Sequence, residues 1–220
     1  MNPYVNIHTH QVGEGINILD VGEGKAWVDK EIKEGQDVFY SVGIHPMKLH
    51  ELGEGFLGEF QDTVRMKKVI AIGECGLDRR SPVRIESQER VLEIQVGLAE
   101  ELHKPLIIHC VKAYSELIAV RKRMKSSVPW VIHGYNNNRQ ILQQLLEHGF
   151  YISVGTALLN ARSNIFQLLR TIPLDVLFLE NDDKKVEIHV IYETASTILG
   201  IDVETLKEII WRNYNGVFIK

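Results

Sequence analysis

At 220 residues, with 45% hydrophobic and 25% charged residues, the chain has the length and composition of one globular domain. Its formal net charge of −4 argues against a sequence-independent nucleic-acid coat protein, which would be strongly basic. No apolar run reaches the length of a membrane-spanning helix, and the start lacks a basic region followed by an apolar stretch. We therefore expect a single domain over 1–220, with no signal peptide, in the cytoplasm.

Short aliphatic and β-branched runs alternate with longer amphipathic segments along the chain. Eight runs are predicted as strands: 4–8, 16–20, 38–43, 68–74, 106–110, 130–134, 151–154 and 175–181. Helices are predicted over 24–33, 55–67, 85–103, 112–126, 137–148, 161–171, 186–199 and 203–214. Eight alternating units with apolar strands predict an α/β fold, a parallel (β/α)8 barrel of the TIM type. Only Gln11 to Gly15 separate the first two strands, so we expect distortion or shortening near the N-terminus.

Ionisable side chains follow five of these apolar runs, at the point where each run ends. They are His8, His10, Glu74, His109, His133 and Asp182. The carboxyl ends of the strands are where parallel barrels carry their chemistry. Four imidazoles and two carboxylates are too many ligands for one tetrahedral ion and fit a pair of divalent ions. This donor set suits zinc, manganese, iron or nickel better than magnesium, and it leaves the identity of the metal open.

Residues beside these ligands are expected to orient them. Asp78 follows Glu74 on the same segment, and Glu180 shares a strand face with Asp182. Asp183 is expected in a turn or as a helix cap. Taken alone, Glu74 could instead be a helix cap or a member of a salt bridge.

The ordered motifs H-T-H, G-I-H-P, I-G-E-C-G-L-D, L-I-I-H-C, V-I-H-G and L-E-N-D resemble the TatD family of metal-dependent deoxyribonucleases. Further matching stretches are 88–105, and Asn213 with Phe218 near the end. The resemblance covers nearly the whole chain. It implies a (β/α)8-type barrel, two divalent ions and hydrolysis of phosphodiesters in DNA. It also implies a distribution of ligands: His8, His10 and Asp182 on the first ion, Glu74 as a bridge, and His109 and His133 on the second.

The chain departs from the family pattern mainly on the substrate side. A first helix is missing between His10 and Gly43, and Val111 stands where the family has an arginine. Residues 134–137 replace a C-F-S-G-like stretch, and 183–185 replace a segment that soon reaches a proline. The ligands are retained, so hydrolysis is expected while DNA as the substrate is left open.

Cations follow the predicted ligands on two of the strands. They are Arg79, Arg80, Lys184 and Lys185. Around metal ions in an otherwise acidic protein, such cations would attract a phosphate-bearing substrate. The alternative is that they are solvated loop cations with acidic partners. His45, in G-I-H-P, is predicted to contact the substrate or its phosphate, the alternative being a packed turn.

We therefore predict an enzyme, a divalent-metal-dependent hydrolase that cleaves phosphodiester bonds, most closely a TatD-like deoxyribonuclease with a two-metal mechanism. In this mechanism Asp182 would orient or deprotonate the attacking water, and Glu74 would bridge the ions. Two alternatives stay open: hydrolysis of an amide, lactone or other small carbonyl compound, and a metal-binding relative without turnover. DNA or another phosphodiester is the expected partner. We expect a monomer with no membrane association and no obligate protein partner.

Overall fold

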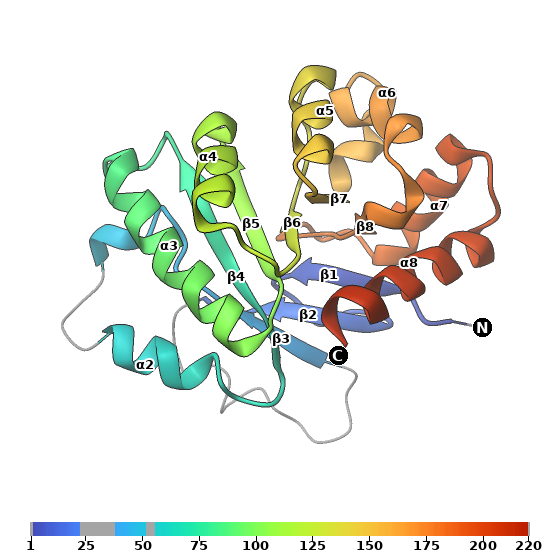
Figure 1. Cartoon of the computed structure of the whole chain (residues 1–220). Helices are drawn as coiled ribbons and strands as arrows, with labels where there is room; N and C mark the ends of the chain where they lie inside the picture. Colours follow the sequence, from blue (N-terminus) through green and yellow to red (C-terminus); the bar gives the residue numbers. More distant parts are fainter. Residues whose placement is uncertain (1, 23–37, 52–55, 220) are drawn as a thin grey trace. The chain divides into compact units, whose positions relative to one another are not determined.

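The computed structural model describes residues 2–22, 38–51 and 56–219 (Figure 1). Its strands are β1 (Val5–Thr9), β2 (Ile16–Asp20), β3 (Val38–Val42), β4 (Val69–Asp78), β5 (Leu106–Val111), β6 (Trp130–Ile132), β7 (Tyr151–Val154) and β8 (Leu177–Leu179). Its α-helices are α2 (Phe56–Thr63), α3 (Ile85–Leu102), α4 (Tyr114–Met124), α5 (Arg139–Glu147), α6 (Asn164–Leu168), α7 (Ile188–Leu199) and α8 (Val203–Phe218). All eight predicted strands are confirmed.

Apart from differences at helix ends, one predicted helix differs from the observed structure and another cannot be compared with it. The helix predicted over 24–33 lies outside the described residues. The helix predicted over 161–171 is divided into the short α6 and a 3-10 turn, Leu169–Thr171. Ser163 accounts for the late start of α6, because its side chain caps the helix by accepting a hydrogen bond from Phe166 N. None of the helices within the described residues combines the length and apolarity needed to cross a membrane.

The strands follow one another in chain order in one sheet, from β1 to β8. The pairs β1–β2, β3–β4, β4–β5, β6–β7 and β7–β8 are parallel. At the end of β1, Thr9 also forms a parallel bridge with Asp182, directly after β8. This strand order, with helices between strands, is that of a (β/α)8 barrel of the TIM type. The predicted fold class is therefore confirmed.

The β1–β2 connection contains no crossover helix, although the two strands are parallel. The buried Asn17 side chain holds this connection by donating to the carbonyl oxygens of Gly13 (2.9 Å) and Gly15 (3.0 Å). Gly15 has φ +80°, and a Cβ there would lie 2.3 Å from the carbonyl oxygen of Tyr4. The strand at 16–20 is complete, so within the described residues 2–22 the expected shortening affects the connection and not the strand.

The chain packs as two compact parts, which are described separately. The first comprises residues 2–19, 38–39 and 131–219, and the second comprises 20–22, 40–51 and 56–130. In the first part, Phe178 of β8 packs edge-on against Phe218 of α8, with ring centroids 5.6 Å apart. Asn213 of α8 donates to the carbonyl oxygen of Leu177 (3.0 Å), which ties this helix to the start of β8.

In the second part, α3 packs against β4 through an amphipathic face (Figure 1). Two buried glutamines of this face bind the main chain at the ends of strands. Gln95 accepts a hydrogen bond from Ile44 N (2.7 Å), and Gln88 accepts one from Asp78 N (2.8 Å). A buried amide that pairs with main-chain groups fixes those groups, because leaving either partner unpaired would cost about 1–3 kcal/mol. The α3 helix therefore holds the ends of β3 and β4.

Candidate metal-binding site

The first group of potential metal ligands lies where β1 and β8 end. Asp182 Oδ1 is 3.4 Å from His8 Nε2 and 3.5 Å from His10 Nε2. The main chain fixes this arrangement, because Asp182 N donates to the His8 carbonyl oxygen (3.1 Å) and His10 N donates to the Asp182 carbonyl oxygen (3.2 Å). One ligand atom from each of the three residues lies within 4.8 Å of the others. Two imidazoles and a carboxylate at this spacing fit a divalent ion.

Asp182 is held as a carboxylate in this group. Burial opposes its charge, but hydrogen bonds from His10 and His8 and the nearby charges of His8 and His133 lower the pKa of Asp182 well below its usual range. Its backbone is left-handed, with φ +54°, a conformation that aspartate tolerates better than most residues. The ionised side chain can therefore act as a metal ligand or accept a hydrogen bond from water.

His133 lies beside His8 in the same part of the molecule, with ring centroids 4.4 Å apart. His133 Nδ1 is 3.4 Å from Oε1 of Glu180, which is fully buried. Glu180 also accepts hydrogen bonds from Gly134 N (2.7 Å) and from the Ser153 hydroxyl. A carboxylate on one ring nitrogen orients a histidine so that the other nitrogen can bind an ion. Glu180 thus occupies the supporting place that the sequence predicts.

The second group of potential ligands comes from within β4 and β5 and from the segment that follows β3. Glu74 Oε1 is 2.7 Å from His109 Nδ1 and 3.1 Å from His45 Nε2. One ligand atom from each of these residues lies within 4.8 Å of the others. This donor set also fits a divalent ion.

His45 presents a hydrogen-bond donor in this group. Met47 N donates to His45 Nδ1 over 3.1 Å, so the neutral ring carries its proton on Nε2. The Nε2–H group then points at the Glu74 carboxylate, 3.1 Å away. A donor in this place suits an anionic oxygen, whereas a metal ligand would need the lone pair of that nitrogen.

The β4 strand runs to Asp78, beyond the predicted end at 74, so Glu74 lies within the strand. The register between β4 and β5 shifts between Ile72 and Cys75, and Gly76 pairs with His109 beyond the shift. Gly76 has φ +143°, and a Cβ there would lie 1.9 Å from the His109 carbonyl oxygen. Glycine therefore lets β5 approach closely, which brings His109 beside Glu74. The low strand propensity of glycine is the reason that the sequence predicts an end of this strand at residue 74.

Asp78 supports His109 from the other side of the ring. Asp78 Oδ2 lies 2.9 Å from His109 Nε2, and the Asp78 side chain is fully buried. Arg80 donates to the same carboxylate from its main-chain nitrogen (2.7 Å) and from its guanidinium. Burial opposes the charge, but the hydrogen bonds from Arg80 and His109 outweigh it and lower the pKa of Asp78 to about 2. The predicted orienting role of Asp78 thus corresponds to a contact with His109.

Asp20 is a residue of the second group that the sequence analysis did not single out. It ends β2, and its Oδ1 accepts a hydrogen bond from Glu74 N (3.0 Å) and one from the Ser41 hydroxyl (3.5 Å). Asp20 therefore holds the main chain of a predicted ligand. A carboxylate directly after the apolar run 16–19 is the same pattern that indicates Asp182, and it could have identified Asp20 as well.

The predicted substrate-binding cations are exposed, and three of the four pair with carboxylates. Arg79 pairs with Glu116, Arg80 with Asp78, and Lys184 with Asp183. Their side chains remain 48%, 61% and 57% exposed, respectively. Lys185 is also exposed, in the segment before α7. These pairs match the alternative of solvated cations with acidic partners, and Asp183 lies in a turn, as expected.

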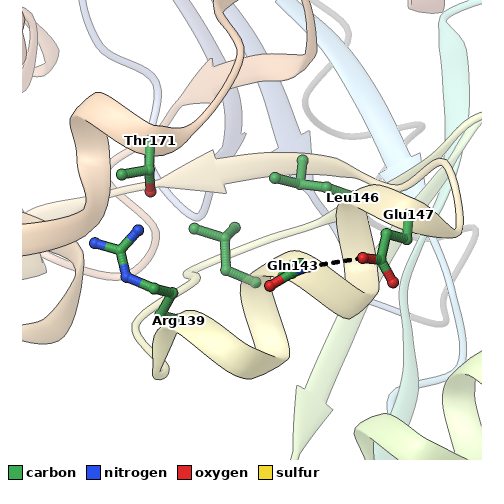
Figure 2. Close-up of a pocket in the computed structure, with 6 residues that line it drawn as sticks. Arg139, Gln143, Leu146, Glu147 and Thr171 are labelled. Atoms are coloured by element: carbon green, nitrogen blue, oxygen red, sulfur yellow. Dashed lines mark hydrogen bonds between the residues drawn. The ribbon is translucent and has the colours of Figure 1, made fainter.

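A surface depression of about 260 Å3 has a different lining (Figure 2). It is formed by Arg139, Leu142, Gln143, Leu146, Glu147 and Thr171. Gln143 donates to Glu147 across 2.8 Å within this lining. None of the predicted ligands takes part, so the candidate site rests on the two side-chain groups and not on this depression.

A parallel barrel with imidazole and carboxylate groups at the ends of its strands defines the class of metal-dependent hydrolase barrels. Within that class, the chain belongs to the TatD-related DNase family, whose model matches residues 8–219. The family expected from the motifs is therefore confirmed.

Individual relatives agree with this family. The 3'-5' ssDNA/RNA exonuclease TatD of Edwardsiella piscicida is 32% identical over 146 residues, which cover 64% of this chain and 56% of that protein. The chain thus spans little more than half the length of this curated relative. YcfH of Escherichia coli K12, described as a metal-dependent hydrolase, is 25% identical over 85% of this chain and 76% of that protein. The crystal structure of YjjV, a TatD homolog from Escherichia coli K12, matches with a TM-score of 0.87 and 21% identity, over 98% of this chain and 97% of that one.

Proposed function

We propose that this protein is a divalent-metal-dependent hydrolase of phosphodiester bonds and that its substrate is DNA. One observation carries the proposal: His8, His10 and Asp182 each offer a ligand atom, and these three atoms lie within 4.8 Å of one another. Membership of a DNase family supports it, as does the relative whose name states an activity on single-stranded DNA and RNA. The monomeric state, the single domain and the cytoplasmic location stay predictions.

We propose that the six predicted ligands bind two ions. His8, His10 and Asp182 would hold the first ion, and His109 and His133 the second, with Glu74 as the bridge that the family resemblance implies. The ligand chemistry favours zinc, manganese, iron or nickel over magnesium. When bound, ions of this kind supply an activated water near neutral pH and positive charge for the phosphoryl oxygens.

The protein's own side chains would position the reactants. The lowered pKa of Asp182 keeps its carboxylate ionised, so that it would accept a hydrogen bond from the attacking water and orient it. The Nε2–H group of His45 would donate to a phosphoryl oxygen, because Met47 N fixes the other ring nitrogen as an acceptor. Glu180 and Asp78 would keep His133 and His109 in the orientations that present a lone pair to an ion.

Exposed cations would receive the phosphate backbone. They are Arg79, Arg80, Lys184 and Lys185. Long-range attraction needs exposed charge and no fixed geometry, so Arg79 and Lys184, which pair with surface carboxylates, can still exchange them for a phosphate, whereas Arg80 would contribute its charge while it keeps its contact with Asp78. The same pairs reduce the net positive charge, and this observation favours the second candidate function, hydrolysis of a small carbonyl compound.

A single comparative assay separates these functions. Protein loaded in turn with Zn²⁺, Mn²⁺ and Mg²⁺ would be offered single-stranded DNA, single-stranded RNA, bis(p-nitrophenyl) phosphate, and a panel of amides and lactones. We expect cleavage of DNA and of the small phosphodiester, and loss of both in the Asp182→Asn variant. Turnover confined to the amides or lactones would contradict the proposed substrate, and absence of turnover with bound metal would leave a metal-binding relative.

A further inference from the structure

Arg80 differs from the other predicted substrate-binding cations in what it contacts. Its main-chain nitrogen donates to Asp78 Oδ1 (2.7 Å), its Nε atom lies 3.1 Å and 3.2 Å from the two carboxylate oxygens, and its Nη2 atom donates to Oδ2 (2.7 Å). The guanidinium thus approaches the carboxylate as a fork, the geometry that fixes both the place and the plane of the acceptor. The partners of Arg79 and Lys184, in contrast, are Glu116 and Asp183, which are exposed by 25% and 59%.

The carboxylate that Arg80 holds is fully buried, and it contacts one of the predicted metal ligands. Asp78 Oδ2 receives both Arg80 Nη2 and His109 Nε2, at 2.7 Å and 2.9 Å. The opposite nitrogen of the His109 ring, Nδ1, faces Glu74 at 2.7 Å. A proton on Nε2 directed at Asp78 leaves the Nδ1 lone pair for an ion. The ring orientation and tautomer of His109 therefore depend on where the Asp78 carboxylate is held.

We propose that Arg80 is a positioning residue for His109 and acts through Asp78. The guanidinium holds Asp78 Oδ2 on His109 Nε2, so that the ring presents Nδ1 to a divalent ion. This proposal rests on the proposed function only in taking His109 as a metal ligand. Arg80 contributes orientation from the surface, because its own side chain is 61% exposed while the carboxylate that it grips is buried.

The first test reads the His109 ring without metal. In metal-free protein labelled with ¹⁵N at histidine, long-range ¹H–¹⁵N correlation reports which ring nitrogen carries the proton, and a His109→Gln variant assigns the signal. We expect Nε2 of His109 to carry a proton that is hydrogen-bonded to Asp78 in the wild type, and we expect that hydrogen bond to be clearly weakened in Arg80→Met. Arg84→Met is the matched control, because Arg84 lies in the same loop, is 84% exposed and pairs with Glu86. An unchanged Nε2–H signal of His109 in Arg80→Met would overturn the proposal.

The second test measures Zn²⁺ affinity by competition with a chelating dye, with the relevant binding step identified as the one lost in His109→Ala. Removing a group that orients a metal ligand typically lowers affinity about 10–100-fold. We expect a fall of about tenfold in Arg80→Met, a smaller fall in Arg80→Lys, which keeps the charge without the fork, and none in Arg84→Met. An equal fall of Zn²⁺ affinity in Arg84→Met would show a general effect of charge and would contradict the role of Arg80. Wild-type affinity in Arg80→Lys would contradict it as well.

A double-mutant cycle isolates the route of action. If Arg80 acts through Asp78, Arg80→Met should change Zn²⁺ affinity little once Asp78 is asparagine, because the two single effects then do not add. Additive effects would overturn the proposal. Circular dichroism checks that each variant folds. If the wild type bound no Zn²⁺, the proposed function would fail, while the measurement of the His109 Nε2–H signal would still decide whether Arg80 orients His109.

Discussion

The close contact of β4 with β5 makes Gly76→Ala the sharpest test of the second ligand group. Gly76 has φ +143°, which side chains of L-residues rarely adopt, and an added Cβ would lie 1.9 Å from the His109 carbonyl oxygen. The backbone conformation alone costs about 1–3 kcal/mol. Relief of the contact requires β4 and β5 to separate locally, which weakens hydrogen bonds of about 1 kcal/mol each. We therefore expect Gly76→Ala to lower the free energy of unfolding by about 3–5 kcal/mol.

Chemical denaturation of metal-free protein, followed by circular dichroism, measures this loss. The control is Gly97→Ala in the interior of α3, where an added Cβ meets nothing within 4 Å. Because alanine is the better helix former, Gly97→Ala should stabilise the protein by up to about 1 kcal/mol. The two substitutions add the same methyl group and should shift the unfolding midpoint in opposite directions. A Gly76→Ala protein within about 1 kcal/mol of the wild type would refute the role assigned to this glycine.

Three further predictions concern turnover, pH and salt. Asp182→Asn should lower turnover about 100-fold or more with the fold intact, since a neutral amide is a poor proton acceptor; activity within a few-fold of the wild type at equal metal content would remove Asp182 from the chemistry. Glu100 accepts hydrogen bonds from Ser126 and Ser127 (both 2.6 Å to their hydroxyls), which outweigh burial and lower its pKa to about 2. This stabilisation, about 1–2 kcal/mol, should be complete above about pH 4.5 and disappear as the pH falls towards 2; thermal melts of Glu100→Gln should lack that loss, whereas the exposed control Glu101→Gln should keep it. Neutralising Arg79, Lys184 and Lys185 together should weaken DNA binding and flatten its salt dependence while hydrolysis of bis(p-nitrophenyl) phosphate stays nearly unchanged; an unaltered salt slope would identify these cations as solvated surface.

The sequence predicts the strands well because their signal is local. Each strand is a short apolar run, and an ionisable residue at the end of five of these runs indicates where the buried chain reaches the barrel rim. The β4 strand is the exception, since Gly73 and Gly76 lower the apparent strand propensity although they are what its neighbours require: a Cβ at Gly73 would lie 2.7 Å from the Ile107 side chain. The close approach of β5 imposes that requirement, so it cannot be predicted from the residues of β4 alone.

For the same reason, the partners of the charged side chains could not be predicted from the local sequence. Arg79 pairs with Glu116, a residue 37 positions away on α4, and the sequence offers no reason to prefer that carboxylate to any other. Asp20 meets Glu74 N across 54 positions. Sequence patterns identified the residue types that stand at the strand ends. Only the packing of those ends decides whether a given charge faces solvent, another side chain or the main chain.

The carboxylates at the strand ends fall into two kinds by what they accept. Three of them accept a hydrogen bond from a main-chain N–H group: Asp20, Asp78 and Glu180. A carboxylate committed in this way belongs to the framework, because a metal ion would have to displace a charge-assisted hydrogen bond to recruit that oxygen. The contacts described for the carboxylates of Glu74 and Asp182 are instead to imidazole nitrogens, which are themselves metal ligands by preference. All five are ionisable residues near strand ends, and their hydrogen bonds separate the two that an ion can recruit from the three that hold the site in shape.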